Sequence, residues 1–255
     1  MLGSHQMSRD AGYHAGAARV ELEMLAGFAL RGNGSTIVVP PAAERLVAYL
    51  ALHERPVQRS QLASALWTDG DDQRSAANLR SALWRLRAIG PAVVTATPGQ
   101  LSIGPAVHVD ARESVELVRS IMDGALPAEH THMLRWLSAD LLPGWYDPWL
   151  ILWQERWRQL RLHALEILAQ RLAAAGCYGQ AVEAALAAVR GEPLRESAHR
   201  CLISVHLVEG NRIEAVRAYH RLAALLRQEL GVAPSADLTR TMADLAGDAP
   251  ATPIW

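Results

Sequence analysis

An internal repeat in the last third of the chain constrains its fold more than any other sequence feature. Identical residues recur at a separation of 34 positions, in a region rich in Ala, Leu and Arg. Because small residues recur where paired helices would cross, the pattern predicts helix hairpins that pack closely on one another. The matched pairs are Ala164 and Ala198, Leu168 and Leu202, Gly176 and Gly210, Ala181 and Ala215, and Val182 and Val216.

A period of 34 residues is that of tetratricopeptide-like helix pairs, which stack into a curved array. Such an array either binds a segment of a partner or serves as structural support, and the sequence leaves both interpretations open. Further helices are expected at residues 109–123 and 131–138, and a longer one begins at Pro148. We therefore predict an all-α second domain over residues 109–246 and a C-terminal tail over 247–255.

Four tryptophans at every fourth position mark the start of the long helix. This spacing places Trp145, Trp149, Trp153 and Trp157 on one helix face. One interpretation is an aromatic platform for a ligand or peptide. Aromatic stripes at helical spacing are more often part of a core, so burial is the preferred prediction.

Residues 74–87 combine basic side chains with apolar residues at helical spacing. The segment holds four arginines and no acid, while Leu79, Leu83 and Leu86 fall on one face. Guanidinium groups suit both phosphate oxygens and guanine edges, and Asn and Ser side chains read base edges. The segment therefore predicts a DNA-recognition helix, with an ordinary solvated basic face as the alternative. The candidate DNA-binding residues are Arg74, Asn78, Arg80, Ser81, Trp84, Arg85 and Arg87.

The elements around this segment complete a recognisable order. An acidic loop at residues 69–72 precedes it, and its negative charge interacts favourably with the positive N-terminal end of the helix dipole. A calcium-binding loop is the disfavoured alternative, because the glutamate that ends an EF-hand loop is missing. Ser60 is expected to cap the second helix. The predicted elements are an antiparallel sheet of residues 20–25, 28–30 and 36–39, helices at 43–53 and 60–67, the arginine-rich helix, and a hairpin of residues 92–96 and 100–103.

A sheet, three helices with the third one basic, and a hairpin are the layout of a winged helix. Its wing would present Thr97 and Gln100 to the DNA backbone. The expected fold class is mainly α with small β sheets: an N-terminal winged helix-turn-helix domain over residues 20–108, after a flexible tail over 1–19, and the C-terminal all-α tetratricopeptide-like domain.

Composition excludes several classes of protein. Half of the residues are hydrophobic, which argues against disorder, and the net charge of −1 conceals 10 Arg against 8 acids before Val109. Cys177 and Cys201 lack metal-ligand spacing, and no apolar run is long enough for a membrane span. The sequence contains neither HExxH nor GxSxG, and histidines such as His163 and His199 are interpreted as core or surface residues. We predict a cytoplasmic protein that is not an enzyme and has no cofactor and no metal.

In this order, the features resemble the SARP-type regulators, activators of antibiotic pathways. These join an OmpR-like winged helix to a bacterial transcriptional activator domain. The resemblance covers about Val20 to Leu245. It is carried by residues 46–52, 62–67, 82–87, 141–144 and 222–234.

The resemblance implies an activator that binds promoter direct repeats as a homodimer and recruits RNA polymerase holoenzyme through its sigma factor, alpha or beta subunits. It implies control of a biosynthetic pathway for secondary metabolites. Arg80, Ser81, Trp84 and Arg85 would face bases, whereas Asn78 and Arg87 would lie at phosphates or groove edges. Two departures stand out: Gln100 and Leu101 replace the aromatic or arginine usual near the wing turn, and Trp84 stands where a polar reader is common.

A rival function is an adaptor or ligand sensor. Its helical domain would bind a peptide or small ligand, and its winged helix would contact protein. The arginine-rich face discriminates between the two, because a protein-binding winged helix does not need Arg80, Arg85 and Arg87 on one exposed side.

Overall fold

The computed structural model describes residues 20–89, 93–124 and 130–247. The predicted tails, except for Gly247, and the first residue of the predicted hairpin, Ala92, lie outside the described residues. The elements in chain order are β1 (Val20–Glu23), β2 (Ala29–Gly32), β3 (Ser35–Ile37), α1 (Pro41–Leu52), β4 (Val57–Gln58), α2 (Arg59–Leu66), α3 (Asp72–Ile89), β5 (Val94–Ala96), β6 (Gln100–Ile103), β7 (Val107–Val109), α4 (Asp110–Met122), α5 (His130–Leu137), α6 (Pro148–Ala174), α7 (Tyr178–Gly191), α8 (Glu196–Glu209), α9 (Arg212–Leu230) and α10 (Ala236–Gly247).

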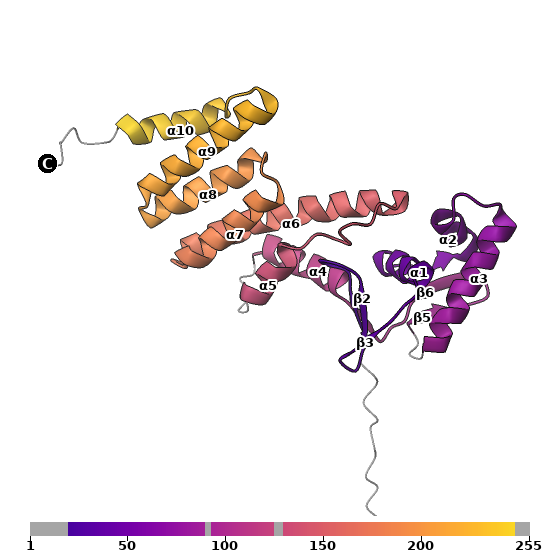
Figure 1. The fold of residues 1–255 in the computed structure, drawn as a ribbon. Coiled ribbons are helices and arrows are strands. Elements are labelled where there is room, and N and C mark those ends of the chain that lie inside the picture. Colours follow the sequence, from indigo (N-terminus) through magenta and orange to yellow (C-terminus); the bar gives the residue numbers. More distant parts are fainter. Residues whose placement is uncertain (1–19, 90–92, 125–129, 248–255) are drawn as a thin grey trace, which may run out of the picture.

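The predicted fold class, mainly α with small sheets, is confirmed. Figure 1 shows α1, α2, α3 and the β5–β6 hairpin grouped at one end of the molecule, and α6 to α10 stacked at the other. The sheet that contains β2 and β3 lies between these groups, beside α4. The strands are therefore confined to the N-terminal part, and the elements after β7 are helices throughout the described residues.

The first sheet has the strand order β3-β2-β1-β7. β1 is antiparallel to β2 but parallel to β7, so that Leu22 pairs with both Leu30 and Val109, and all three side chains are buried. The predicted antiparallel arrangement of the first three strands is confirmed, but the prediction missed the parallel strand β7, whose three residues are too few to show an alternating pattern. β7 includes residues on both sides of the boundary predicted between the two domains.

The second sheet, of order β4-β6-β5, contacts α1 through β6 and α2 through β4. The hairpin of β5 and β6 matches the prediction, whereas the two residues of β4 were not foreseen. The prediction that Ser60 caps the second helix was wrong, because β4 continues in extended conformation up to Gln58 and α2 begins at Arg59. Gln58 is the N-cap residue of α2 and makes no side-chain capping bond.

The helices after α5 follow the predicted repeat. Gly176 and Gly210 both adopt left-handed backbone conformations, with φ of 78° and 86°, in the turns that follow α6 and α8. A side chain with a Cβ atom is strained in that region, which explains why glycine recurs there. Ala181 and Ala215, in the first turn of the second helix of each pair, are both fully buried. These small residues therefore lie at close helix contacts, as the repeat predicts.

The tryptophan stripe packs into the core, as predicted, and joins the two parts of the chain. The placement of Trp145 on the long helix was wrong, because α6 begins only at Pro148. Trp157 is only 5% exposed and its indole N–H donates to the Ala139 carbonyl at 2.9 Å. Trp149 packs against Tyr49 of α1 with ring centroids 5.1 Å apart, and Trp153 meets His53 at 5.4 Å. The start of α6 therefore packs against α1 of the winged helix.

A buried carboxylate ties β1 to the start of α4. The Asp110 carboxylate accepts hydrogen bonds from the backbone N–H groups of Met24 at 2.8 Å, Leu25 at 3.0 Å and Ala111 at 2.6 Å. Burial raises the pKa of Asp110 from its ordinary 3.8 to about 6, and these backbone hydrogen bonds oppose the rise. The folded protein therefore binds a proton at this site more tightly than the unfolded chain does.

This raised pKa predicts a pH dependence of stability that Asp110→Asn should remove. A raised carboxyl pKa stabilises the folded state only while the carboxyl group is protonated. We therefore expect the free energy of unfolding of the wild type, measured relative to that of Asp110→Asn, to fall as the pH rises from about 4 to about 6. Above about pH 6 the difference should stay level. The fall should approach about 3 kcal/mol. Urea denaturation of both proteins across this pH range measures the difference. A difference that stayed constant with pH would contradict the assignment.

Candidate nucleic-acid interface

One face of α3 is buried and holds the helix against the N-terminal core. Ser75, Leu79, Ala82 and Leu86, at helical spacing, make up the buried face, whereas Leu83 is only half-buried. The predicted buried stripe is therefore correct at Leu79 and Leu86, whereas the observed buried face is rotated slightly away from Leu83. α3 also packs against α1 and α2, which brace it from behind.

The start of α3 is fixed by two polar contacts. The Asp71 carboxylate accepts a hydrogen bond from the Arg74 backbone N–H at 2.7 Å, which satisfies a donor of the first helical turn. The buried Ser75 hydroxyl donates to the carbonyl of Trp67, the C-cap residue of α2, at 3.0 Å. The acidic loop thus caps α3, and the hydroxyl fixes the turn between the two helices.

The exposed face of α3 carries the predicted DNA-binding residues in two neighbouring rows. Within the described parts of the chain, the guanidinium groups of Arg74, Arg80, Arg85 and Arg87 have no hydrogen bond or ion pair. Trp84 points directly away from the buried face and is 72% exposed. One row consists of Arg74, Asn78, Ser81 and Arg85, and the other of Arg80, Trp84 and Arg87.

All seven residues thus lie on the solvent side of one helix, although Asn78 is half-buried. Because these arginines have no ion-pair partner within the described residues, binding a phosphate does not require them to break an existing ion pair. The forked N–H donors of a guanidinium group also match phosphate oxygens. The arrangement is therefore available to bind a polyanion.

The turn of the β5–β6 hairpin is closed by Thr97. Its hydroxyl accepts from the Gln100 N–H at 3.1 Å, so the side chain is occupied within the turn although it is exposed. Gln100 is half-buried. The structure therefore places both wing candidates at the hairpin turn, with the exposed Thr97 hydroxyl bonded to the backbone of the half-buried Gln100.

Arg59, which the sequence analysis did not single out, anchors this turn. Its backbone N–H donates to the Gly99 carbonyl at 3.0 Å, and its guanidinium donates to the Thr97 carbonyl at 3.3 Å. Because Arg59 is the first residue of α2, these bonds fix the hairpin turn to the helix that braces α3. An arginine directly after a β residue gave no sequence signal for this contact.

The described residues include no group of three or more His, Cys, Asp or Glu side chains placed to hold a metal ion. His199 is buried, its Nε2 lies 2.9 Å from the Pro193 carbonyl, and burial lowers its pKa. His206 is buried as well, and His163 is exposed, as the core-or-surface interpretation expects. In the part of the chain that the structure covers, no helix is both long and apolar enough to cross a bilayer.

Comparison with known proteins relates the chain to one protein family and to solved structures. A sequence profile of the bacterial transcriptional activator domain matches residues 137–245, which contain α6 to α9 and most of α10. The chain is also similar to the Mycobacterium tuberculosis protein EmbR in complex with a low-affinity phosphopeptide, with a TM-score of 0.65 and 22% identity over 92% of this chain and 67% of that one. At this identity the likeness concerns the fold. The search of curated proteins found no match.

The contact between Ser75 and Trp67 predicts that α3 depends on one hydroxyl. Ser75→Ala should lower the free energy of unfolding by about 1–2 kcal/mol, because the half-buried Trp67 carbonyl loses the hydrogen bond that the buried Ser75 hydroxyl donates. Ser81→Ala is the matched control, since Ser81 is exposed on the same helix and should change stability by less than about 0.5 kcal/mol. Urea denaturation followed by circular dichroism measures both. Equal effects of the two substitutions would show that the hydroxyl does not fix the turn.

Proposed function

We propose that the chain is a SARP-type transcriptional activator that binds promoter DNA sequence-selectively through α3. The match of residues 137–245 to the bacterial transcriptional activator domain supports this proposal. The observation that carries this proposal is the exposed face of α3, where four guanidinium groups have no partner within the described residues. An acid-free arginine face on the third helix of a winged helix fits the negative major groove.

We assign base reading to the residues nearest the centre of that face. Arg80 and Arg85 have the forked donors that pair with the O6 and N7 atoms of guanine, and the Ser81 hydroxyl suits several base edges. Trp84 offers an apolar surface for a sugar or a thymine methyl group. Arg74, Asn78 and Arg87 lie toward the margins of the face and would contact phosphates or groove edges.

The wing would contribute backbone contacts rather than readout. Because the Thr97 hydroxyl is occupied within the turn, contact with phosphate would come from Gln100 and from backbone N–H groups of the turn. Arg59 would act indirectly, by holding the turn beside α2. The wing contribution to affinity should therefore be small beside that of α3.

The second domain would recruit RNA polymerase holoenzyme, through its sigma factor, alpha or beta subunits. Binding of a homodimer to promoter direct repeats would place two such domains next to the polymerase, and the regulated genes would serve a biosynthetic pathway. This activity would take place in the bacterial cytoplasm, at the nucleoid. The resemblance to SARP-type regulators supports these finer assignments.

An adaptor or ligand sensor, with a winged helix that contacts protein, is the rival proposal. Fluorescence-anisotropy titration against a selected oligonucleotide pool and a scrambled duplex, at two salt concentrations, decides between the two. Selective binding that weakens with salt supports the DNA-binding activator. A lack of binding to every duplex would favour the adaptor or sensor.

Base reading by Arg80 predicts a loss of selectivity. Arg80→Ala should weaken binding to the selected site by about 1–3 kcal/mol and leave binding to scrambled DNA nearly unchanged. Arg217→Ala is the control, because Arg217 is an exposed arginine of α9 far along the chain. Equal losses on the selected and scrambled duplexes would assign Arg80 to the backbone instead.

Phosphate contact by Arg87 predicts the opposite pattern. Arg87→Ala should weaken binding to selected and scrambled duplexes alike, and should reduce the slope of log affinity against log salt by about 1, because one fewer counterion is released. Titrations at several salt concentrations measure this slope. A change confined to the selected site, with the slope intact, would contradict the role.

A further inference from the structure

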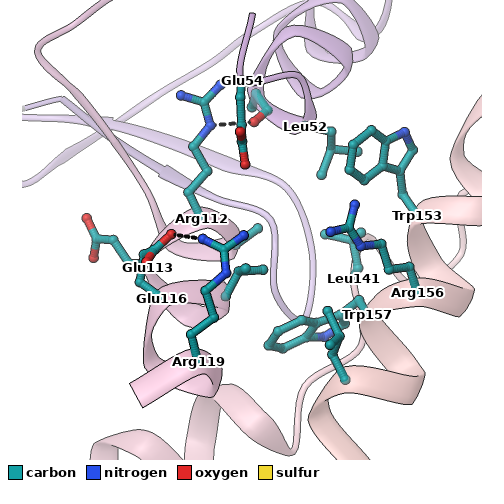
Figure 2. Close-up of a pocket in the computed structure, with 14 residues that line it drawn as sticks. Leu52, Glu54, Arg112, Glu113, Glu116, Arg119, Leu141, Trp153, Arg156 and Trp157 are labelled. Atoms are coloured by element: carbon teal, nitrogen blue, oxygen red, sulfur yellow. Dashed lines mark hydrogen bonds and ion pairs between the residues drawn. The ribbon is translucent and has the colours of Figure 1, made fainter. Parts of the chain in front are cut away.

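A cavity lies where the winged helix meets the second domain. It has a volume of about 310 Å³, within the range of small-molecule sites. Three elements line it: the end of α1 with Ala51 and Leu52, α4 with Val115, and α6 with Trp153 and Trp157. Figure 2 shows the α4 side chains on one side of this space and the α6 side chains on the other.

The inner surface of the cavity is apolar and aromatic. Trp157 and Leu141 are buried at its base, and Trp153, Leu160 and Val115 are half-buried around it. Trp157 is held in place by the bond from its indole N–H to the Ala139 carbonyl. Two indole rings at one cavity favour a flat aromatic occupant, because offset and edge-to-face ring contacts add to the gain from burial.

Most charged groups at the rim already have partners. Arg112 donates from Nε to the Ala51 carbonyl and from Nη2 to the His53 carbonyl, both at 2.7 Å, and so caps the end of α1. Arg119 is paired with Glu116, and Glu113 lies 3.3 Å from the His108 ring. These contacts hold Arg112 and Arg119 in place at the rim, where Glu54 also lies.

Arg156 differs from the other rim arginines. Its guanidinium lies over the Trp153 ring, 5.9 Å from the centroid, and has no hydrogen bond or ion pair within the described residues. The side chain is exposed at the mouth of the cavity, as Figure 2 shows. An unpaired guanidinium beside an aromatic surface is suited to a carboxylate attached to a flat ring.

We propose that this cavity binds a small fused-ring aromatic anion, with its rings against Trp153 and Trp157 and its carboxylate on Arg156. Such a ligand would touch α1 of the winged helix together with α4 and α6, and so would stabilise one arrangement of the two parts. The proposal does not depend on DNA binding, because the ligand contacts none of the residues on the exposed face of α3.

Calorimetric titration of the full chain with naphthoate tests the site, with neutral naphthalenemethanol as the uncharged analogue. We expect saturable one-to-one binding of naphthoate that is about tenfold tighter than that of the alcohol, and a rise in Tm at saturation. Absence of saturable naphthoate binding, or equal affinities for the two compounds, would overturn the proposal.

Two substitutions locate the bound naphthoate. Arg156→Gln should weaken naphthoate binding about tenfold and leave naphthalenemethanol binding unchanged, because it removes the charge and keeps the apolar surface. Val115→Phe should weaken both compounds by filling the cavity, with circular dichroism to verify the fold. Arg240→Gln is the charge-matched control, since Arg240 is an exposed arginine of α10. Naphthoate affinities unchanged in Arg156→Gln, or lowered equally in Arg240→Gln, would show that naphthoate binds elsewhere.

Discussion

The burial of the second half of α1 is the constraint on which the rest of the structure depends. Every residue from Leu46 to Ala51 is buried, so this helix has no solvent-facing side over that stretch. One side of α1 meets α3 and β6, and the other meets Trp149 and Trp153 of α6. A helix that is apolar all round must be covered on all sides. The fold therefore requires the second domain to pack against the winged helix.

This packing connects the cavity with the exposed face of α3. The same helix that supports α3 ends at the rim of the cavity, where Arg112 binds its last carbonyl groups. The cavity rim and the support of α3 are therefore parts of one helix. The cavity and the exposed face of α3 are thus both supported by α1, although their residues come from distant parts of the sequence.

Local patterns were enough to predict α3, the hairpin and the repeat, because helical spacing and turn residues are visible in a short window. Contacts between distant segments were not. β7 pairs with β1 across more than eighty residues, and three residues carry no periodic signal. The prediction of the residue that caps α2 failed for the same reason, since β4 is formed only by its pairing with β6. At the candidate interface, the exposed arginines followed from spacing, whereas the occupied Thr97 hydroxyl and the role of Arg59 required the fold.

The strand order of the first sheet has a consequence for how the winged helix is attached. The chain leaves this sheet from β3 and returns to it at β7, and these are its two outer strands. The intervening residues 38–106 thus form an inserted module with two covalent tethers, which resist twisting far more than a single linker does. A module bounded by two strands of one sheet is also suited to domain exchange. Replacing the residues between β3 and β7 with those of a related chain would transfer the helices and the wing and leave the first sheet and the second domain unchanged.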